Sequence, residues 1–239
     1  MGPHDGPVTS APTDQLPLSP TARSTVRRGA RRARTDRTEL YAVLDAGLVG
    51  HLGVVLDGAP VVLPTGYGRV GDTLYLHGST GAATLRAAAT GQPVAFTVTH
   101  LDGVVYARSS FHHSMNYRCA VVHGTAQLVD DPAERLRALE ALTEQLAPGS
   151  WTATRQPDRR ELAATAVLSL DLTEASLKVR SGPPGDDERD LAADAGPSPV
   201  WAGVLPLHTV LGEPVPDPLL PAGVPVPARV RERSLSSPG

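Results

Sequence analysis

The chain has 239 residues and a formal net charge of −3, and 41% of its residues are hydrophobic. This length allows one large or two small domains, and the charge argues against nucleic acid as an obligatory partner of the whole chain. The single cysteine, Cys119, excludes an internal disulfide framework and fits a reducing compartment.

The N-terminal residues 1–22 are rich in Pro, Ser, Thr and Gly, which predicts a disordered segment. They contain no apolar stretch of signal-peptide length, and no later segment approaches the roughly 20 apolar residues that span a bilayer. We therefore expect a cytoplasmic protein with no membrane partner. Seven arginines follow between Arg23 and Arg37. Because no aromatic residues lie among them for base stacking, they are interpreted as a solvated basic lead-in, and nucleic acid is not expected as a partner.

Turn and cap signals divide the next part of the chain into short elements. Asp36 with Glu39 matches a helix capping box, and Gly47 marks the end of that helix. The pairs Asp57-Gly58 and Asp102-Gly103 are typical of tight hairpin turns. The expected elements are a helix at 36–47, strands at 49–56 and 59–65, a turn at 66–72, a strand at 73–77, an Ala-rich helix at 79–89 capped by Ser79, and strands at 93–101 and 104–110.

The second half continues in the same style. The expected elements there are a strand at 120–129, a helix from Asp131 with Leu136, Leu139, Leu142 and Leu146 on its apolar face, and a strand at 164–172 continuing to 175–180. No alternation of strands and helices typical of a parallel sheet is present, which favours a closed or half-closed antiparallel barrel with peripheral helices. Residues 23–180 form this domain. Residues 181–198 are a polar linker, and the Pro-rich residues 199–239 are expected to wrap over the barrel with Trp201 as anchor.

The stretch SSFHHSMNYRC, residues 109–119, gathers most of the reactive side chains and allows three interpretations. A metal site is not expected, because adjacent histidines in a strand point to opposite faces and no zinc-ligand spacing is present. Haem ligation by a histidine stays open. The histidines considered for metal binding are His77, His100, His112, His113 and His123.

A nucleophilic site would use Cys119, whose thiol pKa the neighbouring Arg118 would lower. A lone cysteine at the start of a strand is, however, more often a small buried residue. The third interpretation is the polar wall of a cofactor pocket, and it fits best. His77, Gly78, Ser79 and Thr80 lie where a strand ends and a helix begins, and hydroxyls with free N–H groups at a helix start suit a phosphate. Arg86 can add a charge-assisted hydrogen bond.

Four motifs in this order carry a family resemblance: DGAPVVLPTGY, DTLYLHGS, LDGVVYARSSFHHSMNYR and VWAGVLP. The chain resembles the flavin-nucleotide-binding proteins of the pyridoxamine 5′-phosphate oxidase-like superfamily, in the branch that includes nitroimidazole-resistance proteins. The resemblance covers residues 30–225. It implies a mainly β fold, a six-stranded antiparallel split β-barrel, in which a homodimer binds FMN at its interface.

The resemblance also implies site residues. Pro64 and Thr65 belong to the strand that runs along the isoalloxazine ring, and Tyr67 follows in the same motif. His77, Gly78, Ser79 and Thr80 correspond to the phosphate end. The strands beside the cofactor supply His112, Ser114, Asn116, Tyr117 and Arg118.

One departure concerns the phosphate end. Relatives have a Ser-Arg pair just after HGS, and here Ala82 and Ala83 stand at those positions, so that Arg86 is the candidate replacement. The implied function is an FMN-dependent oxidoreductase acting on a small molecule, with His77 and His112 as candidates for proton transfer. The alternatives are a non-catalytic flavin or haem binder, and a deazaflavin-dependent reductase on the same fold.

Overall fold

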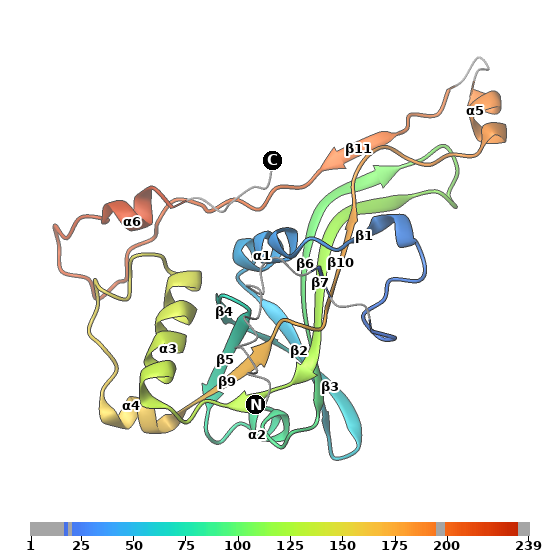
Figure 1. Cartoon of the computed structure of the whole chain (residues 1–239). Coiled ribbons are helices and arrows are strands. Elements are labelled where there is room, and N and C mark those ends of the chain that lie inside the picture. The colour runs from blue at the N-terminus through green and yellow to red at the C-terminus, as the bar shows by residue number, and fades with distance from the viewer. Residues whose placement is uncertain (1–16, 19–20, 195–198, 234–239) are drawn as a thin grey trace, which may run out of the picture.

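The fold consists of two antiparallel β-sheets with peripheral helices (Figure 1), here seen in a computed structural model that describes residues 17–18, 21–194 and 199–233. The larger sheet contains, in spatial order, β1 (Ala33–Arg34), β10 (Ala175–Arg180), β7 (Ser114–Thr125), β6 (Pro93–Tyr106), β2 (Gly50–Leu56) and β3 (Ala59–Thr65), and β11 (Gly203–Pro206) also pairs with β6. The smaller sheet contains β4 (Tyr67–Val70), β5 (Thr73–Ser79), β9 (Thr165–Asp171) and β8 (Gln127–Leu128). The helices are α1 (Arg37–Ala46), α2 (Ala83–Ala88), α3 (Pro132–Leu146), α4 (Arg159–Ala164), α5 (Glu188–Asp194) and α6 (Ala228–Arg231), and a 3-10 turn covers Ala30–Arg32. The predicted antiparallel split barrel with peripheral helices is confirmed.

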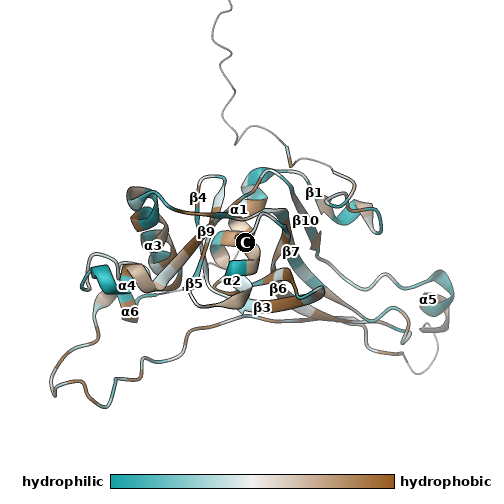
Figure 2. Cartoon of the chain, turned by 90° about the horizontal axis from the view of Figure 1, so that it is seen from below, coloured by the Kyte–Doolittle hydropathy of each residue, from teal (hydrophilic) through white to brown (hydrophobic). Residues whose placement is uncertain are grey.

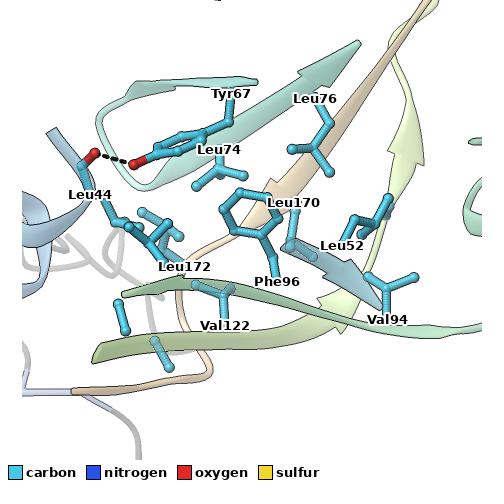
Figure 3. Packing of buried hydrophobic residues seen from close by; sticks show 14 of the residues in the cluster. Leu44, Leu52, Tyr67, Leu74, Leu76, Val94, Phe96, Val122, Leu170 and Leu172 are labelled. Atoms are coloured by element: carbon cyan, nitrogen blue, oxygen red, sulfur yellow. Dashed lines mark hydrogen bonds between the residues drawn. The ribbon is translucent and has the colours of Figure 1, made fainter. Parts of the chain in front are cut away.

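The main core lies between the two sheets (Figure 3). Alternate residues of β6 point inward, so that Phe96 is fully buried, and its ring packs edge-to-face on Tyr67 with 5.2 Å between ring centroids. The Tyr67 hydroxyl donates a hydrogen bond to the carbonyl oxygen of Leu44 in α1, at 2.5 Å. This bond satisfies a buried phenol and fixes the helix against both sheets.

The predicted first helix and first hairpin are confirmed. Asp36 caps α1 by accepting a hydrogen bond from the backbone N–H of Thr38, and Gly47 follows its last turn. Arg37, although charged, is buried, and its guanidinium donates to Asp72 and to the carbonyl oxygen of Leu172. The turn between β2 and β3 has positive φ at both Asp57 (51°) and Gly58 (77°), as a two-residue hairpin turn requires.

The second predicted hairpin is wrong. Asp102 and Gly103 do not form a turn, because β6 is one continuous strand that pairs with β7 along its whole length and only shifts register between Leu101 and Gly103. Such a β-bulge re-aims a side chain without ending the strand. The absent side chain of Gly103 also leaves room for β11, since a Cβ there would lie 3.0 Å from a methyl group of Val204.

Two smaller predictions also need correction. The segment predicted as a turn at 66–72 contains the strand β4, and the turn itself is limited to Gly71 and Asp72. Ser79 does not cap α2, because it is the last residue of β5, and the N-cap residue is Ala82, which offers no side-chain hydrogen bond. The Ser79 hydroxyl instead accepts a hydrogen bond from the N–H of Gly81.

The C-terminal residues 199–233 form an extended strap that crosses the molecule from the outer end of β6 towards α3 (Figures 1 and 2). Near its start, the ring of Trp201 packs against Tyr106 with 5.7 Å between centroids. The strap then pairs with β6 as β11. Further on, Arg229 of α6 lies beside Gly149, just after α3.

Most of the segment predicted to be disordered, residues 1–16 and 19–20, lies outside the described residues. Within it, Leu18 is buried in the main core, and its N–H donates to the carbonyl oxygen of Thr35. The side chain of Leu18 thus packs in the core. None of the helices in the described ranges has the length and apolarity needed to cross a membrane.

We expect Gly68→Ala to destabilise the fold strongly. Helix α3 packs directly on β4 there, and a Cβ at position 68 would lie 2.6 Å from the backbone of Ala141 and of Leu142. Overpacking of this kind costs about 1–3 kcal/mol, which urea-induced unfolding measures. Gly66→Ala is the matched control, since nothing lies within 4 Å of a Cβ at that position. Equal unfolding free energies for the two variants would contradict the close packing.

Candidate functional site

A cleft of about 700 Å³ lies between the larger sheet, the loop after α1 and the strap. Strands β6 and β7 have 14 and 12 residues, and their ends project beyond the body of the barrel (Figure 1). The projecting part forms one wall of the cleft. A cleft of this volume lies within the usual range for ligand and cofactor sites. Its lining comes from Ala46, Gly47, Leu48, Val49, Thr99, His100, Leu101, Asp102, Asn116, Arg118, Val179, Arg180, Ser181, Leu207, His208 and Thr209.

The bulge residue Asp102 joins the two walls of this cleft. Its carboxylate accepts two hydrogen bonds from the Arg118 guanidinium on β7, at 3.0 and 2.8 Å. Its carbonyl oxygen accepts a hydrogen bond from the N–H of Leu207 in the strap, at 3.0 Å. One residue thus orients an arginine in the cleft and fastens the strap that covers it.

Arg118 retains an unused donor. Its Nη1 atom is buried and has no hydrogen-bond partner within the described part of the chain. Since Asp102 already accepts from the other two guanidinium nitrogens, this remaining donor is available to a ligand.

A second cation, Arg180 of β10, carries a charge that its own contacts do not neutralise. Its guanidinium donates to the side-chain oxygen of Asn116 and to the carbonyl oxygens of Gly182 and Pro183. Burial lowers the pKa of Arg180 below its ordinary value, and nearby arginines act in the same direction. A half-buried guanidinium bonded only to neutral oxygens favours an anionic group in the same cleft.

Two histidines line the cleft from opposite walls. His100 of β6 donates from Nε2 to the carbonyl oxygen of Val43 near the end of α1, at 2.9 Å. This bond leaves Nδ1 as the unprotonated ring nitrogen when the ring is neutral. His208 comes from the strap and is exposed.

A smaller hollow of about 280 Å³ lies between β5, α3 and the segment 151–165, and His77 lines it. Desolvation by the surrounding protein lowers the pKa of His77 below its ordinary value of 6.5. At the rim, the Arg155 guanidinium donates two hydrogen bonds to Glu161, which lowers the pKa of Glu161 to about 2. His77 is therefore a neutral ring, able to accept a proton, near neutral pH.

Of the predicted cofactor-binding residues, only Asn116 and Arg118 line the cleft, and only His77 lines the smaller hollow. Pro64 and Thr65 lie at the end of β3, in register with His51 and Gly50. The residues of the predicted phosphate end lie on β5, in the turn that follows it and in α2. They are His77, Gly78, Ser79, Thr80 and Arg86.

Three other predicted residues lie elsewhere. Tyr67 is buried in the core, and its hydroxyl donates to the carbonyl oxygen of Leu44. Tyr117 points to the face of β7 opposite Asn116, because neighbouring side chains in a strand alternate. Ser114 is the first residue of β7.

The two predicted proton-transfer residues are not brought together within one chain. His77 lies on β5, whereas His112 lies in the turn between β6 and β7, in a different part of the molecule (Figures 1 and 2). His112 faces Asp187 at 3.3 Å.

Three ionisable residues of the cleft were given no role in a site from the sequence. Asp102 was assigned to a turn, Arg180 to the end of a strand without a role, and His208 to the wrapping tail. The signal available for the first was the Asp-Gly pair itself, which also occurs at bulges. No local pattern marked the other two, because only pairing of distant strands brings them to the cleft.

The comparisons with known proteins agree with this fold. The family model described as pyridoxamine 5′-phosphate oxidase matches residues 36–179. The flavocytochrome Anf3 from Azotobacter vinelandii is 39% identical, with a TM-score of 0.84 over 92% of this chain and 100% of that chain. The FAD and haem binding protein from Mycobacterium smegmatis is 44% identical, with a TM-score of 0.80 over 86% of this chain and 100% of that chain.

A more distant likeness concerns the fold alone. A protein from Bacteroides thetaiotaomicron named for 5-nitroimidazole antibiotic resistance is 20% identical, with a TM-score of 0.54 over 62% of this chain and 86% of that chain. No curated protein matches this chain. Two solved structures thus resemble the chain over nearly its full length.

We expect the ring of His77 to titrate below pH 6.5 in an NMR titration of the folded protein. Desolvation disfavours its charged form, so the folded state binds fewer protons than the unfolded state at mildly acidic pH. The contribution of His77 to stability is therefore present above pH 6.5 and decreases as the pH falls through the folded pKa. The urea-unfolded protein serves as the control, and a folded pKa at or above 6.5 would contradict the desolvation.

Proposed function

We propose, because the chain belongs to the pyridoxamine 5′-phosphate oxidase family, that it is a flavin-dependent oxidoreductase acting on a small molecule. One observation carries the proposal. Two relatives that cover 92% and 86% of this chain have names that denote a flavin protein: one is a flavocytochrome and the other binds FAD and haem. Sequence identities of 39% and 44%, over most of this chain and all of each relative, favour a shared cofactor.

Two flavin nucleotides are compatible with this proposal. The sequence resemblance implies FMN, whereas the relative from M. smegmatis binds FAD. Both nucleotides carry a phosphate directly after the riboflavin part, so one phosphate end serves either of them. We propose Ser79, Thr80 and Arg86 for that role.

The local contacts support Arg86 as the replacement for the missing first-turn arginine. Its Nη1 atom donates to the carbonyl oxygen of Gly81 at 2.8 Å, which holds the guanidinium beside the turn that contains Ser79. The N-cap residue of α2, Ala82, supplies no side-chain acceptor to the first turn. A phosphate beside this turn would meet one cation, two hydroxyl groups and backbone N–H groups.

A second group, haem, is favoured by the names of both relatives and by the cleft. In the cleft, the buried Nη1 atom of Arg118 has no hydrogen-bond partner among the described residues. Arg180 has no carboxylate among its hydrogen-bond partners. These two donors suit the carboxylates of haem. Of the histidines that line the cleft, His208 is exposed and His100 is engaged at Nε2, so we propose His208 as the iron ligand.

The residues of this chain then have separate tasks. A bound flavin exchanges two electrons with a substrate, and a bound haem exchanges one. Arg118 and Arg180 bind and orient an anionic group in the cleft, while the strap residues Leu207 to Thr209 limit the access of water. His77, neutral at pH 7, can take up a proton at the smaller hollow.

We further propose a homodimer. Strand β3 lies at the edge of the larger sheet, and two of its large apolar side chains are exposed, Val62 at 64% and Leu63 at 40%. An edge strand with apolar side chains favours pairing with another surface.

The cofactors of the purified protein test the proposal. We expect an absorption spectrum with the bands of oxidised flavin, and release of FAD or FMN after denaturation, identified by chromatography. A Soret band that His208→Ala shifts or removes, with flavin retained, would support haem in the cleft. A colourless protein that binds neither FMN nor FAD would overturn the proposed function.

We expect Arg86→Ala to weaken binding of the flavin nucleotide about ten- to a hundredfold, the effect of losing a charge-assisted bond worth about 1.5–3 kcal/mol. Binding of riboflavin, which lacks the phosphate, should not change. Fluorescence titration of FMN, FAD and riboflavin into cofactor-free protein measures both effects. Arg28→Ala, at an exposed arginine of the basic lead-in, is the control. An unchanged nucleotide affinity in Arg86→Ala would place the phosphate elsewhere.

A further inference from the structure

A group of metal-ligating side chains lies outside both hollows, at the outer end of the β6–β7 pair. The turn between these strands carries His112, and the chain after β10 brings Asp187 and Asp190 against it. In Figure 1 this region is where α5 stands beside the end of β6 and β7. The three residues come from segments about 75 positions apart, so their meeting is a result of the fold.

The geometry of the group suits a single ion. One ligand atom from each of His112, Asp187 and Asp190 lies within 4.8 Å of the other two. The Nε2 atom of His112 is 3.3 Å from an oxygen of Asp187. Atoms that bind one ion at about 2.1 Å lie roughly 3 to 3.5 Å apart, so small side-chain rotations complete the arrangement.

Two of these atoms are buried and unsatisfied. In the described part of the chain, Nε2 of His112 and Oδ2 of Asp190 have almost no exposed area and no hydrogen-bond partner. The neighbouring histidine differs, because Nδ1 of His113 accepts a hydrogen bond from the N–H of Ala107. Buried polar atoms are normally paired, and a bound ion would satisfy both of these at once.

The surrounding charges leave an excess of negative charge at the group. Asp186 is already paired with Arg108, at 2.8 Å, and that contact lowers the pKa of Asp186. Besides its contact with His112, Asp187 lies 3.4 Å from the guanidinium of Arg189, whose side chain is exposed. Two carboxylates and a neutral imidazole carry a charge of −2, which a divalent cation balances.

We propose that His112, Asp187 and Asp190 bind a divalent transition-metal ion of the zinc class. An imidazole nitrogen favours zinc, iron or nickel over magnesium and calcium, and carboxylates complete such sites. Three protein ligands leave at least one position for water. The ion fastens the segment before the strap to the β6–β7 turn.

The probe is Zn²⁺, added to chelator-treated full-length protein with its cofactors bound. We expect one Zn²⁺ per chain in a competition titration with a chromophoric chelator, and no competition from Mg²⁺. Asp190→Asn preserves the shape of the side chain but replaces an anionic ligand by a neutral amide, and it should weaken the binding of Zn²⁺ at least about tenfold, the lower end of the loss seen even for groups that only orient a ligand. His112→Gln should weaken it by at least as much.

Glu188→Gln is the matched control, because it removes the same charge from the same helix at an exposed residue outside the group. It should bind Zn²⁺ like the parent. Thermal unfolding and the visible spectrum of each variant establish that the fold and cofactors are intact. Zn²⁺ binding that is absent in the parent, or equally strong in Asp190→Asn, His112→Gln and Glu188→Gln, would overturn the proposal whatever cofactor the protein carries.

Discussion

The continuous pairing of β6 with β7 through the bulge at Asp102 is the constraint on which the rest of the structure depends. Because β6 does not turn at Asp102, both strands project beyond the barrel and create the wall of the cleft. The register shift directs the carboxylate of Asp102 to Arg118, and its carbonyl oxygen holds Leu207 of the strap. A turn at this position would have removed the cleft, the orientation of Arg118 and the attachment of the strap together.

The strap converts an open sheet surface into a bounded site. Pairing of β11 with β6 fixes its direction, and the aromatic contact between Trp201 and Tyr106 fixes its start. The segment then places His208 opposite His100, from a part of the chain more than 100 residues away. Arg180, the last residue of β10, has no carboxylate among its hydrogen-bond partners. It reaches the cleft because β10 pairs with β7, so the charge of the cleft also depends on pairing between strands far apart in the sequence.

The candidate site was predictable in its residue types more than in its arrangement. The cluster around Asn116 and Arg118 was recognisable because polar residues interrupt an otherwise apolar strand pattern. Tyr67 was assigned to the same site, but its ring lies in the core against Phe96. Burial of a large ring there stabilises the fold more than a surface position would. His77 and His112 were both chosen for proton transfer because each carries an imidazole. In the structure they lie on different elements, β5 and the β6–β7 turn.

The sequence by itself determined the antiparallel class, the first helix, the first hairpin and the family resemblance, because local signals act over a few residues: alternation, a cap at Asp36 and positive φ at Asp57 and Gly58. Only the tertiary structure decided that Asp102 and Gly103 form a bulge. The Asp-Gly dipeptide is compatible with a turn as well as with a bulge. The bulge forms because β6 pairs with β7 on one side and with β11 on the other. The same holds for the groups that meet across long separations, Arg180 with Asn116 and His112 with Asp187, whose contact no local pattern encodes.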